Sequence, residues 1–176
     1  MITLILGEMW SGKTSELIRR IDRAKCAEQP TVLYKYGNDT RYVGRTGLVS
    51  SHSNLTREAV PIMSLENEPT PARGTVIGVD EGQFIDGLTA FCERVADAGC
   101  YVIVSALSSD FQRNAFPRIN ELLPKAEEIV RLHAVCFICK GEASFSKRIV
   151  SSDSLELIGG KESYAAVCRT CFKAPQ

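Results

Sequence analysis

A single motif near the N-terminus constrains the fold of this chain more than any other feature. The run Gly7–Thr14 (GEMWSGKT) matches the pattern G-x-x-x-x-G-K-[ST]. An apolar segment, Ile2–Leu6, precedes it and reads as a buried strand, while apolar residues at helical spacing follow it until Pro30. In this strand–loop–helix context, backbone N–H groups and the helix N-terminus surround phosphate oxygens, so the motif predicts a nucleotide-binding loop.

Side chains of this loop have separate predicted roles. Lys13 is expected to reach the β- and γ-phosphates, and the Thr14 hydroxyl is expected to bind Mg²⁺. The residues predicted to contact the nucleotide phosphates are Gly7, Glu8, Met9, Trp10, Ser11, Gly12, Lys13 and Thr14.

Two adjacent acids end a later apolar run. Asp80 closes the segment 75–80, and ligands of parallel sheets bind at the carboxyl ends of the strands. Asp80 is therefore expected to hold Mg²⁺ through water beside the phosphate loop, while Glu81 accepts a proton from an attacking hydroxyl or water. The alternatives are an Asp that caps the turn before Gly82 and a solvated Glu at a strand end.

The remaining pattern alternates between strands and helices. Apolar runs at 31–36, 75–80, 100–107 and 128–132 read as strands, and amphipathic segments at 88–98 and 119–123 read as helices. The long apolar runs are typical of strands that are buried on both faces. Residues 37–72 show little periodicity, and no element is predicted there. The pattern predicts an α/β fold with a mostly parallel sheet.

Four of the seven cysteines form two C-x-x-C pairs, Cys136/Cys139 and Cys168/Cys171. An odd number of cysteines fits a disulfide framework poorly, whereas two such pairs in a reduced compartment fit a closed, structural zinc site with four thiolates. Redox-active pairs and a zinc ribbon that binds nucleic acid are the alternatives. The other three cysteines, Cys26, Cys92 and Cys100, are expected to be small core residues.

Composition limits the domain organisation and the partners. The 176 residues are enough for one domain with a small appendage, and the character of the sequence changes at Cys136. We therefore expect an ATP-binding domain over 1–135 and a zinc-binding domain over 136–176. Lys+Arg and Asp+Glu both number 21, which argues against a general nucleic-acid binder. Because no signal peptide or membrane-spanning run is recognisable, a cytoplasmic location without membrane association is expected.

Taken in order, the motifs resemble those of the type II (cytosolic-type) thymidine kinases. The likeness covers nearly the whole chain. After the phosphate loop, the matching segments are 35–36 (KY), 39–42 (DTRY), 80–84 (DEGQF), 111–113 (FQR), both cysteine pairs and 158–160 (IGG) before Tyr164.

This resemblance implies a RecA-like domain that holds ATP–Mg²⁺ and a zinc domain that carries a lasso loop in about residues 144–165. It implies transfer of the γ-phosphate of ATP to the 5′-hydroxyl of thymidine, and also of deoxyuridine, in deoxynucleotide salvage for DNA synthesis. It further implies feedback inhibition by dTTP and a homotetramer, with a dimer as the alternative assembly.

The resemblance also implies roles for individual residues. Glu81 would be the general base, Asp80 and Thr14 would form the magnesium site, and Asp39, Arg41 and Gln83 would lie near the phosphates of ATP. The zinc ligands would be Cys136, Cys139, Cys168 and Cys171. The nucleoside pocket would contain Met9, Phe84, Leu107, Phe111, Phe116, Leu155 and Tyr164, and backbone groups of Leu157, Ile158 and Gly159 would read the base.

Other features complete the set of expectations. The sequence departs from the family pattern at Ser108-Ser109, where an Asp-Gly pair is common. Arg41 or Arg113 would stabilise charge on the transferring phosphoryl group, whereas the basic pair Lys147-Arg148 is expected to be solvated. The rival functions are an ATPase that remodels nucleic acid and a nucleotide-binding regulatory module without turnover.

Overall fold

The computed structural model describes residues 1–39, 47–50, 55–150 and 163–173. Their central feature is a six-stranded sheet with the order β5-β2-β6-β7-β1-β8, in which every neighbouring pair is parallel. The α/β class and the parallel sheet predicted from the sequence are confirmed. The strands are β1 (Ile2–Gly7), β2 (Thr31–Tyr36), β5 (Val60–Ile62), β6 (Val76–Asp80), β7 (Tyr101–Leu107) and β8 (Glu128–Leu132).

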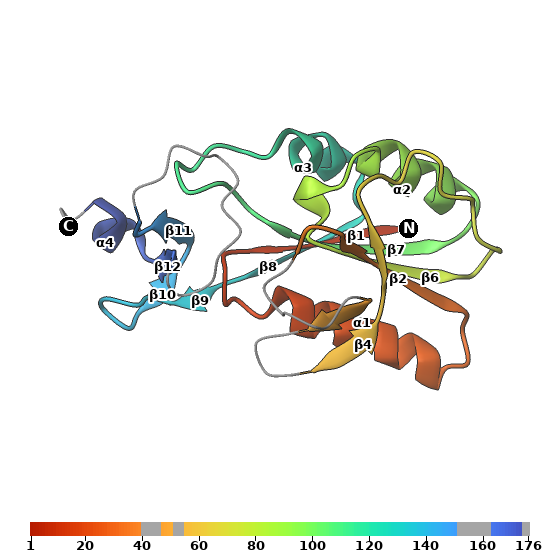
Figure 1. The fold of residues 1–176 in the computed structure, drawn as a ribbon, viewed down its shortest axis with the longest axis horizontal. Helices are drawn as coiled ribbons and strands as arrows, with labels where there is room; N and C mark the ends of the chain where they lie inside the picture. The colour runs from red at the N-terminus through yellow and green to blue at the C-terminus, as the bar shows by residue number, and fades with distance from the viewer. Residues whose placement is uncertain (40–46, 51–54, 151–162, 174–176) are drawn as a thin grey trace.

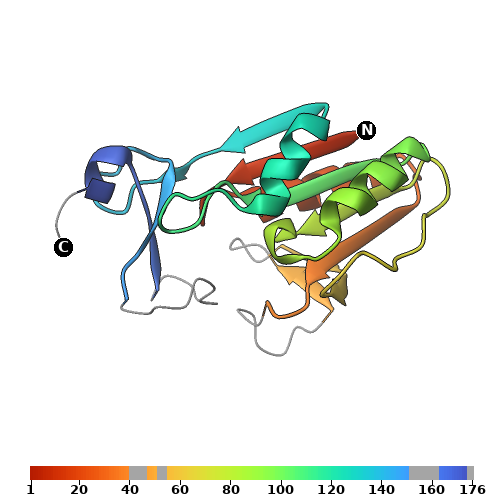
Figure 2. The same ribbon diagram turned by 90° about the horizontal axis from the view of Figure 1, so that it is seen from above.

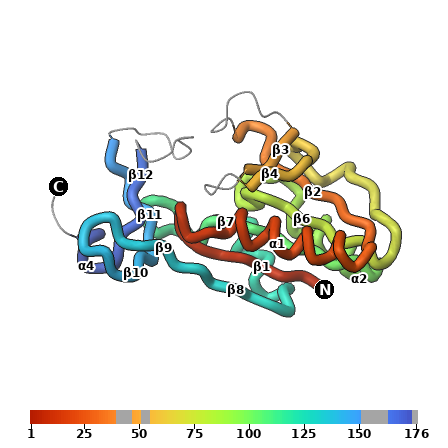
Figure 3. The backbone as a smooth tube through the Cα atoms, turned by 90° about the horizontal axis from the view of Figure 1, so that it is seen from below, coloured from red at the N-terminus to blue at the C-terminus, as the bar shows by residue number. Residues whose placement is uncertain are grey.

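Helices cover both faces of this sheet, as Figure 1 shows. On one face lies α1 (Lys13–Cys26), which the view from below in Figure 3 shows in front of the strands. On the other face lie α2 (Leu88–Asp97) and α3 (Pro117–Leu122), and single 3₁₀ turns occupy Gly82–Phe84 and Leu123–Lys125. Because α3 uses Pro117 as its first residue, where a missing N–H costs nothing, it begins two residues before the predicted start at 119.

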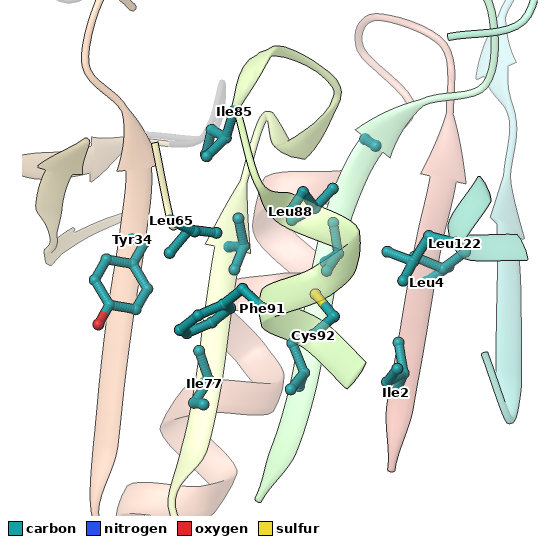
Figure 4. Packing of buried hydrophobic residues seen from close by; sticks show 14 of the residues in the cluster. Ile2, Leu4, Tyr34, Leu65, Ile77, Ile85, Leu88, Phe91, Cys92 and Leu122 are labelled. Carbon is teal, nitrogen blue, oxygen red and sulfur yellow. The ribbon is translucent and has the colours of Figure 1, made fainter. Parts of the chain in front are cut away.

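Two apolar clusters hold the helices onto the sheet. In Figure 4, Phe91, Leu88 and Cys92 of α2 pack against Leu4 and Ile77 of the strands. On the opposite face, one side of α1 packs against β1, β2, β6 and β7. This burial explains the near-continuous apolar runs in β1 and β6, because each of those strands contacts a cluster on both faces.

Gly78 of β6 allows α1 to approach the sheet closely. A Cβ at this position would lie 2.6 Å from Leu33 Cδ1 and 3.1 Å from Ile21 Cδ1. We expect Gly78→Ala to lower the free energy of unfolding by about 1–2 kcal/mol, because overpacking outweighs the smaller entropy gain from replacing glycine. Urea denaturation followed by circular dichroism measures this change. An unchanged midpoint would show that Leu33 and Ile21 move aside without cost.

No element was predicted in the segment 37–72, but its described residues form three short strands. Two of them, β3 (Leu48–Ser50) and β4 (Thr56–Glu58), form an antiparallel pair. The third is β5, which includes Pro61 and lies at the edge of the main sheet. Proline is tolerated at a sheet edge, but three-residue strands with a proline give no periodicity that a sequence can reveal.

A C-terminal lobe, comprising the described residues 134–150 and 163–173, follows the sheet. It contains β9 (Ala134–Val135), β10 (Glu142–Ala143), β11 (Phe145–Arg148), β12 (Tyr164–Val167) and α4 (Arg169–Lys173). Figure 2 shows the arrowheads of β1 and β8 directed at this lobe, so the lobe lies beyond the carboxyl ends of the strands. It has an apolar cluster of its own, which includes Cys136 and Cys171.

The isolated cysteines divide into two groups. Cys92 and Cys100 are buried, as predicted, and Cys92 belongs to the α2 side of the core. The prediction for Cys26 was wrong, because this residue is exposed at the last position of α1. Burial on this helix falls on Leu17, Ile18, Ile21 and Ala24, and Cys26 is off that face.

Candidate active site

The predicted phosphate loop, residues 7–14, joins the end of β1 to the start of α1. Its chain reversal uses left-handed backbone at Trp10 (φ 63°) and at Gly12 (φ 88°), which is the N-cap of α1. Gly7 has no room for a side chain, since a Cβ there would lie 2.6 Å from the carbonyl oxygen of Leu132. The buried ammonium of Lys13 donates to the Glu8 carbonyl oxygen at 2.8 Å. The loop therefore presents its backbone and a lysine at the N-terminus of a helix, which is an anion-binding arrangement.

Beside this loop lies the carboxylate of Asp80, the last residue of β6. The Thr14 hydroxyl donates to Asp80, with its oxygen 3.2 Å from Oδ1 and 3.4 Å from Oδ2. Asp80 is only 5% exposed, and the Ser105 hydroxyl of β7 also donates to its Oδ1. The two residues predicted to hold Mg²⁺ are therefore in contact, although they are distant in sequence. A hydroxyl and a carboxylate are hard oxygen donors of the kind that Mg²⁺ prefers.

Glu81 follows Asp80 directly but has a different backbone conformation. Its φ of 56° and ψ of 41° lie in the left-handed region, which is uncommon for a residue other than glycine. Its Oε2 accepts a hydrogen bond of 2.6 Å from the Gln83 amide, and the Gln83 oxygen accepts one from the Leu107 N–H at 3.2 Å. The strained turn and the buried amide fix this carboxylate separately from Asp80. Such strain is common at functional sites.

Aromatic side chains lie near the same end of the sheet. The Phe84 ring packs against Tyr36 and Phe116, with centroid distances of 5.2 and 5.7 Å. Both Phe84 and Phe116 also pack against the core cluster of α2, which gives their rings a structural role in addition to the predicted one. Met9, also predicted for the pocket, is buried in the phosphate loop, and its N–H donates to the Ser146 hydroxyl of the lobe at 3.4 Å.

The four paired cysteines meet in the C-terminal lobe. The Sγ atoms of Cys136, Cys139, Cys168 and Cys171 all lie within 4.8 Å of one another. Cys139 and Cys168 have sulfur atoms 3.7 Å apart, close to the separation of about 3.8 Å expected between thiolates around a tetrahedral zinc ion with bonds of about 2.3 Å. The set therefore fits a four-coordinate metal ion.

Local hydrogen bonds favour the thiolate form of two of these cysteines. Burial acts to raise the pKa of Cys136, but backbone N–H groups of Cys139, Cys168 and Ile138 outweigh it, and the pKa falls to about 6. The backbone N–H of Cys171 lowers the pKa of the Cys168 thiol. The hydrogen bond with the Cys168 sulfur acts in the opposite direction on Cys171 and raises the pKa of its thiol to about 12. Two of the four cysteines are therefore held toward the thiolate form, which is the form that binds metal.

The family model for thymidine kinase matches residues 1–172. The chain belongs to the thymidine kinase family. A cytosolic thymidine kinase of Gallus gallus is 47% identical over 178 residues, which cover 99% of this chain and 79% of the relative. Thymidine kinase 1 of Dictyostelium discoideum is 46% identical, with 99% and 78% covered, and the thymidine kinase of Myxoma virus (strain Lausanne) is 44% identical, with 97% and 95% covered.

Several predicted thymidine kinase residues lie outside the described part of the chain: Arg41, Leu155, Leu157, Ile158 and Gly159. Most of the expected lasso, residues 151–162, also lies outside it, and the described strands β11 and β12 flank this segment. Asp39 is half-buried after β2, where its carbonyl oxygen accepts a hydrogen bond of 3.5 Å from Lys35. No helix among the described residues is long and apolar enough to cross a membrane.

The expectation for the arginine of the basic pair was wrong. Arg148 is not solvated: it is 8% exposed, its guanidinium lies 3.7 Å from the centroid of the Phe111 ring, and it donates to the Tyr164 hydroxyl at 2.8 Å. Arg113, which was predicted as an alternative to Arg41 for stabilising phosphoryl charge, lies over Phe172 of the lobe, 4.7 Å from the ring centroid. Arginine stacks on aromatic rings because its planar cation is weakly hydrated, and a sequence alone does not show which ring it will meet.

Sequence reasoning also missed three serines that support the site. Ser105 donates to Asp80, Ser146 accepts from the Met9 backbone, and the Ser108 hydroxyl donates to Glu8 Oε1 at 2.9 Å. Ser105 had a usable signal, because it is a lone hydroxyl in the apolar run of β7 and needs a buried partner. The other two contacts join distant segments and left no local pattern.

Proposed function

We propose that this member of the thymidine kinase family transfers the γ-phosphoryl group of ATP to the 5′-hydroxyl of thymidine, and also of deoxyuridine. The observation that carries the proposal is the juxtaposition of Thr14 with Asp80 at the phosphate loop, next to a second carboxylate on Glu81. ATP would lie with its phosphates on residues 7–14, assisted by Asp39, Arg41 and Gln83. Phosphoryl transfer needs such positioning and charge stabilisation more than covalent chemistry.

We assign the two acids different roles. Thr14 and Asp80 would hold Mg²⁺, which would neutralise negative charge on the phosphates of ATP. Glu81 would be the general base that accepts the proton of the 5′-hydroxyl. The Gln83 hydrogen bond and the left-handed backbone support this assignment, because they aim the Glu81 carboxylate independently of Asp80.

The nucleoside pocket is proposed to lie between the carboxyl ends of the strands and the C-terminal lobe. Met9, Phe84, Leu107, Phe111, Phe116 and Tyr164 would enclose the sugar and the base, together with Leu155. Backbone groups of Leu157, Ile158 and Gly159 would read the edge of the base. Support comes from the contacts that already join the two sides, from Met9 to Ser146 and from Phe111 to Arg148.

The C-terminal lobe is proposed to be a zinc domain over 136–176 that follows an ATP-binding domain over 1–135. Cys136, Cys139, Cys168 and Cys171 would supply four thiolates, which close the coordination shell and leave no position for catalysis. The separate apolar cluster of the lobe supports this division. A lobe of this size needs a metal staple to present a loop rigidly.

The family also supports proposals about the setting of the enzyme. We propose a cytoplasmic homotetramer, or a dimer, that is inhibited by dTTP and supplies dTMP for DNA synthesis. The relatives from Gallus gallus, Bos taurus and Cricetulus griseus bear names that state a cytosolic location.

The decisive experiment offers ATP with each of the four deoxynucleosides to the purified enzyme. Thymidine should be phosphorylated, and deoxyguanosine should be used at least about 10³-fold less efficiently in kcat/KM, because a purine would leave pocket hydrogen-bonding groups unpaired. Deoxyuridine tests the tolerance for a base without the methyl group. Comparable use of deoxyguanosine and thymidine would refute the pocket. ATP hydrolysis that needs nucleic acid instead of a nucleoside would favour the remodelling ATPase.

A further inference from the structure

The inner face of β11 carries a buried arginine that joins both sides of the proposed pocket. Along this strand burial alternates, so Ser146 and Arg148 share the buried face. Ser146 contacts the phosphate loop through Met9, which shows that this face is directed at the ATP-binding part of the chain. Arg148 therefore lies on the lobe but faces the other domain.

Arg148 contacts two aromatic side chains of different origin. Its guanidinium carbon is 3.7 Å from the centroid of Phe111, which belongs to the loop after β7. Its Nη2 donates to the hydroxyl of Tyr164 at 2.8 Å, and Tyr164 is its direct partner across the β11–β12 pair. The same guanidinium lies 5.4 Å from the Tyr164 ring centroid. One rigid cation thus sets the separation between a ring of the sheet side and a ring of the lobe.

A second arginine contact strengthens this connection from the opposite direction. Arg113, two positions after Phe111, places its guanidinium over Phe172 and Phe145 of the lobe, at 4.7 and 5.8 Å. The loop after β7 thus supplies Phe111, on which Arg148 of the lobe stacks. The same loop supplies Arg113, which stacks on Phe172 and Phe145 of the lobe. These contacts fix the loop that carries Phe111 against the lobe.

We propose that Arg148 is a positioning residue that determines the affinity for thymidine by holding Phe111 and Tyr164 at the spacing of a pyrimidine nucleoside. The inference rests on the proposed function, in which those two aromatics contact the substrate. The Arg148 side chain acts through the two rings and has no part in the phosphoryl transfer itself. It affects the nucleoside half of the site and leaves the phosphate loop unchanged.

The first test compares three variants in steady-state kinetics. Arg148→Met keeps the length but removes the charge and the hydrogen bond, so the KM for thymidine should rise about 10- to 30-fold, as expected for loss of a desolvated cation–π contact and a hydrogen bond. The KM for ATP should stay within about twofold, and kcat at saturating thymidine should fall less than about threefold. Arg148→Lys keeps the charge without the planar fork and should recover only part of the loss.

Lys147→Met is the matched control, because the neighbouring residue points to the other face of β11. It should leave the KM for thymidine unchanged. Zinc content, measured for every variant by elemental analysis, reports whether the lobe is still folded. If Arg148→Met retains zinc and the wild-type KM for thymidine, or if its KM values for ATP and thymidine rise together, the inference is wrong.

A milder variant decides the matter if Arg148→Met loses zinc. Tyr164→Phe removes only the hydroxyl that accepts a hydrogen bond from Arg148. Adding Arg148→Lys to the Tyr164→Phe variant should weaken thymidine binding by a smaller factor than adding Arg148→Lys to the wild-type enzyme. Strict additivity of the two changes would overturn the inference, because residues that act as one unit are coupled. A wild-type enzyme that fails to phosphorylate thymidine would instead refute the proposed function, and this inference with it.

Discussion

Replacing Glu81 by Gln should lower kcat by about 10²–10⁴-fold, the range for loss of a positioned general base. The affinities for ATP–Mg²⁺ and thymidine should change little, since Gln has nearly the same size and can keep a hydrogen bond with Gln83. The lower end of the range applies if the transition state is loose and asks little of the base. The measurement is kcat with both substrate affinities, under conditions in which chemistry limits the rate.

Asp80→Asn provides the contrast, and Glu121→Gln, at an exposed position of α3, is the control. The Asp80 variant should weaken Mg²⁺ binding and shift the dependence of the rate on Mg²⁺, because this carboxylate contacts Thr14 and Ser105 rather than Gln83. Wild-type kcat for Glu81→Gln would reduce Glu81 to a carboxylate at a strand end, and another base would have to be found.

Removing the metal should abolish thymidine binding while the sheet remains folded. We expect about one zinc per chain by elemental analysis, from the four thiolate ligands. Without the ion, no bond joins the four cysteine side chains, and the lobe that carries Arg148 and Tyr164 should lose its order. Calorimetry with thymidine, combined with circular dichroism, follows binding and the fold of the sheet in the same chelated sample.

Cys26→Ser is the matched control for this experiment, because Cys26 is exposed on α1 and lies outside the cysteine cluster. It should keep zinc and bind thymidine normally, whereas Cys171→Ser should lose both properties. ATP should still bind to the chelated protein, since the phosphate loop belongs to the sheet. Metal-free protein with unchanged thymidine affinity would contradict the proposed role of the lobe.

The sequence was sufficient to predict the helices and strands that bury apolar surface. The bounds predicted for β2 and β8, 31–36 and 128–132, agree with the structure because each is a short run bounded by turn signals. The contact of Thr14 with Asp80 was also foreseeable, since the carboxyl ends of parallel strands meet.

Contacts between distant segments were not foreseeable in the same way. Nothing local distinguishes Arg148 from its half-buried neighbour Lys147, and the burial of Arg148 depends on Phe111 of the loop after β7. The short strands of 37–72 could not be predicted for a similar reason. For example, β5 is defined by its pairing with β2 and not by its own composition.

The position of β1 within the sheet has a consequence for synthesis of the chain on the ribosome. This strand lies between β7 and β8, so its pairing partners begin only at Tyr101 and Glu128. At about 5–20 residues per second, on the order of 5–20 s separates the emergence of β1 from that of β7. During that interval an apolar strand has no sheet to join and depends on α1 or a chaperone for cover. The phosphate loop is thus the first part of the site to be made and among the last to acquire its final shape.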